Sequence, residues 1–442
     1  MTTASLRSVY PGASTLSSPA SGGAPGRPPA QAGVPGVGRG FDPRRLRRKF
    51  PIFSNNPGLV FLDSGASAQK PASVIDRVAD YYRIDYANVH RGVYRLSARS
   101  TELFEEAREK VRRFLNAADP REIVFVRNTT EAINLVAQSW GPTFLKPGDE
   151  VLISVLEHHS NIVPWQLLRD RIGIRLVVAP LDATGGLDLA GFEARLSSRT
   201  RLVAITHVAN ATGALVPVET VIRLAHRQGA KVLLDGSQAA PRLPVDVQAM
   251  GCDFYAFTGH KVYGPTGIGV LYGRYDLLAT MPPWQGGGDM ILNVTFEKTE
   301  FQDPPHRFEA GTPDISGAIG LGAAIDFIEA LGRDNILEHE EALTGYGVDR
   351  LSRISGLQLL GAGQRRLGIF SFDLEGVHPH DLAQVLDQHH VAVRAGHHCA
   401  QPLLESLGHP ATTRASLGVY NDERDIDRLA EAIETAREMF RR

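Results

Sequence analysis

The sequence predicts an α/β protein, with a large domain built around a mostly parallel sheet and a smaller α+β domain after it. Between residues 51 and 328, short β-branched runs alternate with helical patterns, which indicates βαβ units. The strand runs show no inner alternation of apolar and polar residues, as expected for a sheet buried on both faces. Beyond about residue 329 the pattern changes to long helices that flank short strands.

The expected elements follow one another in chain order. Strands are predicted at 123–126, 151–155, 174–178, 202–206, 231–235, 253–257 and 268–271, with helices at 130–140, 161–171 and 219–228 among them. Further helices are predicted at 336–355, 379–389 and 422–441, with strands at 357–360, 369–373 and 392–394. We therefore expect a large domain over residues 61–328 and a small domain that combines residues 42–60 with 329–442.

Composition limits the functions that this chain can have. Its 442 residues are 43% hydrophobic and 22% charged, and the net charge of -2 gives the whole chain no attraction to nucleic acid. No apolar run reaches the roughly 18 to 20 residues that cross a bilayer. The 2 cysteines, Cys252 and Cys399, exclude a disulfide framework and favour a reducing, cytoplasmic location.

Residues 1–41 differ from the rest of the chain. They contain no Asp or Glu and are rich in Gly, Pro and Ser, so we expect a disordered tail that cannot bury enough apolar surface to fold. The lack of acids, together with Arg7, Arg27 and Arg39, also resembles an organelle transit peptide, but no amphipathic period supports that alternative. A plain extension of a cytoplasmic protein is the favoured interpretation.

A glycine-rich stretch at 258–269 and an aspartate, Asp235, carry the strongest chemical signals. Each directly follows a predicted strand, where open α/β sheets bind ligands. Lys261 lies in the glycine-rich stretch, and lysine forms Schiff bases with carbonyl cofactors, although a surface lysine beside a phosphate loop would look similar. Asp235 is suited to keep a pyridine nitrogen protonated, but helix capping and metal binding are equally common uses of such a residue.

Three further clusters are candidates. Residues 128–131 carry hydroxyls that cap a helix or bind phosphate, and capping is the commoner case. In 157–161, His158 could stack on an aromatic ring, move protons or simply fill the core. In 394–402, Cys399 stands among histidines and arginine, cations that favour the nucleophilic thiolate. A buried filler, as expected for Cys252, and a zinc ligand are the alternatives, but no second ligand pair has zinc spacing, so no metal is predicted.

Together these motifs resemble the pyridoxal-phosphate-dependent cysteine desulfurases of the class V aminotransferase family. The resemblance runs from Phe61 to Phe440 and includes motifs at 62–71, 88–92, 206–210, 307–313 and 414–416. The segment Arg-x-Gly-His-His-Cys-Ala marks the second type, the Suf-pathway and selenocysteine-lyase branch. The fold that this implies is the fold type I of pyridoxal-phosphate-dependent transferases. Thr258, Ser237 and Ala395 stand where serine, alanine and threonine are common in the family.

The resemblance implies how a pyridoxal 5'-phosphate cofactor would be held. Lys261 would bind it covalently and later move protons. Asp235 would pair with the ring nitrogen, Gln238 would pair with the ring hydroxyl, and His158 would stack on the ring. The phosphate would be bound by Thr130, Thr258, His260 and, from the partner subunit, Thr312. The last assignment implies a homodimer with shared active sites.

The resemblance also implies the reaction. Arg414 and Asn210 would bind the substrate carboxylate, while His90 and Arg394 would line the site. Cys399 would take the sulfur of L-cysteine as a persulfide and release L-alanine, to supply iron–sulfur cluster assembly through a SufE-like or SufU-like sulfur acceptor. The alternatives are a selenocysteine lyase acting on L-selenocysteine, a transaminase-like relative in which Cys399 is incidental, and a non-catalytic scaffold or histidine-rich metal binder. We expect neither nucleic acid nor a membrane among the partners.

Overall fold

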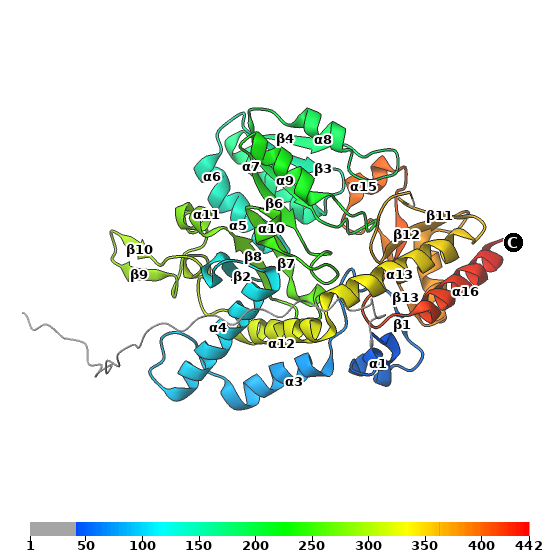
Figure 1. The fold of residues 1–442 in the computed structure, drawn as a ribbon, viewed down its shortest axis with the longest axis horizontal. Coiled ribbons are helices and arrows are strands. Elements are labelled where there is room, and N and C mark those ends of the chain that lie inside the picture. Colours follow the sequence, from blue (N-terminus) through cyan, green and yellow to red (C-terminus); the bar gives the residue numbers. More distant parts are fainter. Residues whose placement is uncertain (1–40, 362, 442) are drawn as a thin grey trace, which may run out of the picture. The chain divides into compact units, whose positions relative to one another are not determined.

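The computed structural model describes residues 41–361 and 363–441, all within one compact unit, Gly40–Arg442 (Figure 1). Apart from Phe41, the predicted tail lies outside the described residues. The helices are α1 (Pro43–Arg47), α2 (Pro51–Asn55), α3 (Ala72–Asp80), α4 (Arg95–Leu115), α5 (Thr129–Leu135), α6 (Gly141–Phe144), α7 (Val163–Ile172), α8 (Leu189–Arg195), α9 (Val218–Arg227), α10 (Val247–Met250), α11 (Tyr275–Thr280), α12 (Ile315–Leu331), α13 (Arg333–Ser352), α14 (Pro379–Gln388), α15 (Gln401–Ser406) and α16 (Glu423–Phe440).

The strands fall into one large sheet, one small sheet and two strand pairs. They are β1 (Val60–Phe61), β2 (Ile123–Val126), β3 (Glu150–Ser154), β4 (Arg175–Ala179), β5 (Thr200–Thr206), β6 (Lys231–Asp235), β7 (Phe254–Thr258), β8 (Gly269–Gly273), β9 (Ile291–Val294), β10 (Thr299–Phe301), β11 (Leu357–Leu359), β12 (Ile369–Leu374), β13 (Val391–Ala392), β14 (Arg394–Gly396) and β15 (Thr412–Ser416). The strands predicted for the large sheet are all present, within two residues of the expected bounds.

The large sheet has seven strands in the order β2-β8-β7-β6-β5-β3-β4. Strands β7, β6, β5, β3 and β4 pair in parallel, and β8 runs antiparallel to both of its neighbours. The prediction of an α/β fold with a mostly parallel sheet is therefore confirmed. All of the parallel strands end at the same edge of the sheet, and that edge carries the site described below.

Both faces of this sheet are covered by helices, which explains its continuously apolar strands. Helices α4, α9 and α12 pack on one face, with Ile319 of α12 in that core. Helices α5 and α7 pack on the other face, with Trp165 of α7 in the second core. Successive strand residues point to opposite faces, so Val232 and Leu234 belong to the first core and Leu233 to the second.

The small sheet is antiparallel, in the order β11-β12-β15-β14. Side chains of α13, α14 and α16 form its core, which also includes Val60 and Leu62 from the start of the chain. This is the expected α+β arrangement. The exact division into a 61–328 domain and a 42–60 plus 329–442 domain stays a prediction, because the described chain is one compact unit.

Several elements differ from the expected ones. The helix predicted at 130–140 is α5 followed by a wider π-helical turn, Val136–Trp140, and the strand predicted at 392–394 is split between β13 and β14. Helices α3, α4 and α12 were not predicted. In the part of the chain that the structure describes, no single helix is long and apolar enough to cross a membrane, and α12 and α13 meet that test only as a pair bent by 74°.

Candidate active site

One pocket of about 250 Å³ lies where β5, β6 and β7 end. The last residues of these strands, Thr206, Asp235 and Thr258, line it. Most other residues singled out by the sequence line the same pocket: Thr130, His158, Asn210, Gln238, His260, Lys261, Arg394, Cys399 and Arg414. Segments far apart in the sequence therefore meet at the carboxyl edge of the sheet, the place expected for a ligand in an open α/β fold.

Lys261 is held on a short 3₁₀ turn, Gly259–Lys261, directly after β7. Gly259 allows the turn to approach its neighbour, since a Cβ there would lie 2.7 Å from Ile268 Cγ2. Burial lowers the pKa of Lys261 to about 8, although the nearby Asp235 carboxylate opposes the shift. A lysine that loses its proton near neutral pH presents the amine form that attacks a carbonyl group.

Asp235 ends β6 with a fixed side chain. Its Oδ1 accepts a hydrogen bond from the backbone N–H of Ser237 at 2.9 Å. Gly236 is required at the turn between them, because a Cβ would lie 2.1 Å from the ring of Tyr255. The aspartate is thus oriented from behind by the main chain, while its carboxylate lines the pocket.

The side chain of Gln238 already makes hydrogen bonds within the protein, which the sequence alone does not reveal. Its Nε2 donates to the carbonyl of Gly65 at 2.7 Å, and its Oε1 accepts from Arg242 Nη1 at 2.9 Å. A ligand hydroxyl would therefore share Gln238 with these partners. The neighbouring Ser237 hydroxyl, which stands where alanine is common, is bonded to the hydroxyl of Thr129 at 2.8 Å and links β6 to the start of α5.

His158 lines the pocket just after β3. Its Nδ1 accepts a hydrogen bond from the backbone N–H of Ser160 at 3.0 Å, which orients the ring. Burial lowers the pKa of His158 to about 4, and the charge of Lys261 acts in the same direction. The imidazole is therefore neutral near pH 7, as a ring that stacks on another ring should be.

Several buried polar atoms in the pocket have no hydrogen-bond partner within the described chain, and they indicate where a ligand would bind. Among the described residues, Thr258 Oγ1, Asn210 Oδ1 and Arg414 Nε are buried without a hydrogen-bond partner. Such orphaned atoms are rare in folded proteins because each forfeits the hydrogen bond it makes with water. A hydroxyl donor, an amide oxygen and a guanidinium fit a ligand that carries a phosphate, an ammonium and a carboxylate. The residues present therefore fit pyridoxal 5'-phosphate with an amino acid.

Arg414 is the buried cation of the pocket. Its Nη1 donates to the carbonyl of Asn210 at 3.0 Å, and its Nη2 lies 3.3 Å from Asp63 Oδ1. Burial lowers the pKa of Arg414 to about 10, so it remains charged near pH 7. Asp63 also binds the more exposed Arg394 at 3.1 Å. This shared counter-ion was not singled out as a site residue, although it lies in the quoted motif at 62–71.

Cys399 lies exposed in the loop between β14 and α15 and lines the pocket. The loop is strained, because His398 (φ 52°) and Cys399 (φ 55°) are consecutive non-glycine residues in the left-handed region. Cys252 is buried, and burial raises the pKa of its thiol, as expected for an inert filler. In the described chain, no group of three or more His, Cys, Asp or Glu side chains is placed to hold a metal ion.

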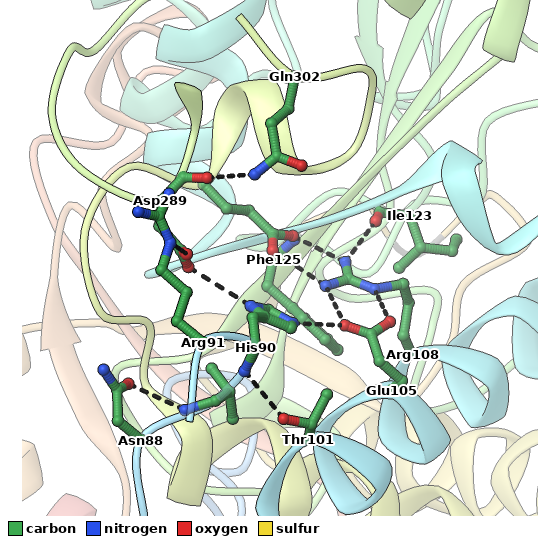
Figure 2. Close-up of polar contacts among 12 residues, drawn as sticks. Asn88, His90, Arg91, Thr101, Glu105, Arg108, Ile123, Phe125, Asp289 and Gln302 are labelled. Carbon is green, nitrogen blue, oxygen red and sulfur yellow. Dashed lines mark hydrogen bonds and ion pairs between the residues drawn. The ribbon is translucent and has the colours of Figure 1, made fainter. Parts of the chain in front are cut away.

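His90 lies outside this pocket, in a charged network between α4 and the loop before β9 (Figure 2). Its ring nitrogens lie 3.2 Å from Glu105 Oε1 and 3.4 Å from Asp289 Oδ2. The hydrogen bond to Glu105 raises the pKa of His90. Within its own chain, His90 is thus placed to carry charge in this network rather than to line the pocket.

Thr312 is also outside the pocket of its own chain. It borders a second cavity of about 350 Å³, which Gly267 and Trp284 also line. The expected contribution of Thr312 to a phosphate site across a subunit interface stays a prediction.

Glu157 is a buried carboxyl group beside the pocket residue His158, and the sequence analysis assigned it no role. It is fully buried next to His158, and its carboxyl group accepts from Asn161 Nδ2 at 2.7 Å and from the backbone N–H of Thr206 at 3.1 Å. Burial raises the pKa of Glu157 to about 8, against these hydrogen bonds. Its position in the quoted run 157–161 at a strand end was the available signal.

The pKa of Glu157 predicts a loss of stability as pH rises. The ordinary pKa of 4.5 applies to the unfolded chain, so between pH 4.5 and about 8 the folded chain holds one more proton and unfolding becomes easier. The lost contribution is on the order of 4–5 kcal/mol. In Glu157→Gln, the fall in Tm between pH 5 and pH 8 should shrink, whatever the absolute Tm. Exposed Glu431→Gln is the control, and an unchanged pH slope in Glu157→Gln would contradict the assignment.

Comparison with known proteins gives consistent matches. Residues 60–429 match the model of the family described as Aminotransferase class-V. A cysteine desulfurase of Synechococcus elongatus is 51% identical over 397 residues, 89% of this chain, which spans only 63% of that relative's length. A cysteine desulfurase of Pectobacterium atrosepticum is 50% identical over 88% of this chain and 97% of its own length. The crystal structure of the cysteine desulfurase CsdA from Escherichia coli has a TM-score of 0.85 and 40% identity, covering 91% of this chain and 100% of that one.

Proposed function

This chain belongs to the class-V aminotransferase family, and on that premise we propose that it is a pyridoxal-phosphate-dependent cysteine desulfurase of the second type. It would convert L-cysteine to L-alanine and leave the sulfur as a persulfide on Cys399. The observation that carries the proposal is the meeting of Lys261, Asp235 and the exposed Cys399 in one pocket, although the three come from separate segments. A scaffold or a metal binder has no use for that combination.

Different residues around the pocket would bind different parts of the cofactor. Pyridoxal 5'-phosphate, when bound, supplies an electron-withdrawing ring next to the substrate carbons. Lys261 Nζ would hold the cofactor and carry protons to and from those carbons, and its lowered pKa suits that exchange near neutral pH. Asp235 would keep the ring nitrogen protonated, and the neutral ring of His158 would cover the cofactor.

The substrate carboxylate would be bound by Arg414. Its unpaired Nε supplies a donor, and the bonds from Arg414 to Asn210 and Asp63 fix the guanidinium in place. The unpaired Oδ1 of Asn210 would accept from the substrate ammonium or the cofactor.

Sulfur transfer is then a balanced two-electron exchange. The Cys399 thiolate attacks the sulfur of L-cysteine, and an S–S bond forms while the Cβ–S bond breaks. The electron pair of the broken bond stays on Cβ, which takes a proton and becomes the methyl group of alanine. Each sulfur is oxidised by one electron and Cβ is reduced by two, so no external oxidant is needed.

We also propose a homodimer and a protein sulfur acceptor. Thr312 lies outside the pocket of its own chain, and a second copy could place it at the cofactor phosphate of its partner. The exposed thiol of Cys399 is accessible to a SufE-like or SufU-like acceptor that would pass sulfur to iron–sulfur cluster assembly. Two free cysteines fit a reducing, cytoplasmic location.

Mass spectrometry after incubation of the holoenzyme with L-cysteine tests the function. We expect one extra sulfur atom on Cys399 and none on buried Cys252, which serves as the internal control, together with one alanine per turnover. In Cys399→Ala, release of sulfide from L-cysteine should be lost, whereas L-selenocysteine cleavage can persist because selenide leaves without a thiol. Sulfide release from L-cysteine that survives in Cys399→Ala would overturn the persulfide reaction.

A further inference from the structure

The loop that carries Cys399 needs support from outside itself. Two consecutive residues, His398 and Cys399, adopt left-handed backbone angles, which are strained for a non-glycine residue. Such a conformation persists only where neighbouring groups hold it. Inside the loop and its own sheet, the support is a turn bond from the Ala400 N–H to the His397 carbonyl and a bond between the His398 ring and Thr412 Oγ1 at 2.9 Å.

Two residues from the large-sheet side supply the rest. Asn210 Nδ2 donates to the carbonyl of His398. His159 makes two bonds: its backbone N–H donates to the carbonyl of Cys399 at 2.7 Å, and its ring Nε2 accepts from the N–H of Gln401 at 3.1 Å. His159 therefore holds the main chain by hydrogen bonds at Cys399 and at Gln401, two residues later.

We infer that His159 is a positioning residue that holds the Cys399 loop in its transfer-competent conformation, by gripping the main chain on both sides of Ala400. His159 does not line the pocket itself, so it acts through the loop rather than on the substrate. The role in sulfur transfer rests on the proposed desulfurase function, whereas the two hydrogen bonds from His159 to the loop do not depend on it.

The residue that holds the Cys399 loop, His159, directly follows His158 in the sequence. His158 caps the 3₁₀ turn His159–Asn161, and its ring is fixed by Ser160. The same short turn thus orients the ring of His158, which is expected to cover the cofactor, and His159, which holds the Cys399 loop. A shift of this turn would move both, so cofactor geometry and cysteine position are set together.

The ring bond requires the neutral form of His159, since Nε2 must accept. The titratable groups that face it are His397 on the cysteine loop and His158 on its own segment. Burial lowers the pKa of His159, and His397 acts in the same direction, so the accepting form persists at neutral pH and is lost only in acid. Protonation of Nε2 would place its N–H opposite the N–H of Gln401. The hydrogen bond would then be lost and the loop would be released.

Hydrogen–deuterium exchange at the Gln401 backbone N–H, measured in the holoenzyme without substrate, tests these hydrogen bonds directly. His159→Phe keeps a ring but loses the acceptor, so the loop should open more often and the rate of deuterium labelling should rise about fivefold, the factor expected for one lost hydrogen bond. His159→Gln, whose Oε1 reaches a similar position, should restore the wild-type rate. His159→Pro removes the N–H as well at a first helical position that tolerates proline, and should give a larger rise. Exposed His380→Phe is the control and should label as wild type.

Turnover and pH complete the test. In His159→Phe, kcat should fall by at most about fivefold, with little change in KM or in cofactor absorbance, because the pocket residues stay in place. Because labelling itself slows in acid for both proteins, the quantity to compare is the ratio of the wild-type to the His159→Gln labelling rate, and this ratio should rise as the pH falls. Wild-type labelling in His159→Phe, or a Gln variant as impaired as the Phe variant, would overturn the inference. Absence of alanine production by the wild type would instead refute the desulfurase, and leave the labelling comparison intact.

Discussion

Replacing Lys261 with alanine is expected to reduce alanine production from L-cysteine by at least about a thousandfold, since the variant loses the proposed covalent anchor and proton carrier at once. The lowered pKa of Lys261 and its place in the pocket support its proposed role as the reactive amine. The cofactor should also be retained less well on gel filtration, which its visible absorbance would report. Exposed Lys298→Ala is the matched control and should keep both properties.

The same variant tests whether two chains share a site. Mixed dimers of Lys261→Ala with Thr312→Ala should regain activity, because one of their two pockets then has an intact lysine and receives an intact threonine from the other chain. With random pairing, about a quarter of the wild-type sites should be active. Lys261→Ala mixed with Cys399→Ala should regain no activity, since both residues line the pocket of their own chain and each pocket of the mixed dimer therefore lacks one of them. A mixture with Thr312→Ala that shows no more activity than its parents would argue against the shared site.

The fold was predictable where local pattern and burial agree. The large sheet is buried on both faces, so its strands are continuous apolar runs that stand out from their surroundings. Helix α12 was missed because glycines interrupt its pattern, and their reason is tertiary: at Gly322 a Cβ would lie 3.3 Å from Ala107 Cβ of α4. A close helix contact of this kind cannot be seen in the sequence of one helix alone.

The candidate site was predictable where a motif contains the group that is proposed to react. Lys261, Asp235 and Cys399 follow strands, and the fold brings the ends of those strands together. Supporting residues such as Glu157 and His159 were not assigned, since their roles depend on hydrogen bonds to segments far along the chain. His90 and Thr312 lie outside the pocket of their own chain, so no single-chain argument can test their expected contacts.

The network in Figure 2 is expected to dominate stability near Thr312. The side chains of Arg108 and Glu309 are only 2% and 5% exposed, and they form a paired contact, with Nη1–Oε1 at 2.7 Å and Nη2–Oε2 at 2.9 Å. Glu309 also accepts from the backbone N–H of Phe125 at 2.7 Å, and Arg108 donates to the carbonyl of Ile123 at 2.8 Å. The pair therefore fastens β2 to α4 and to the segment that leads to Thr312.

Arg108→Met should lower the free energy of unfolding by about 3–5 kcal/mol, because it leaves the Glu309 carboxylate buried without its counter-ion. Urea unfolding of the holoenzyme measures this. In the double variant Arg108→Met with Glu309→Met, the loss should be smaller than the sum of the two single losses, since no unpaired charge remains at position 309. Lys110 lies on the same helix as Arg108 and forms a more exposed pair with Asp326 of α12, so Lys110→Met should cost less than about 1 kcal/mol. Additive single losses would mean that Arg108 and Glu309 act separately, and the segment before Thr312 would then be held by the Phe125 bond rather than by the ion pair.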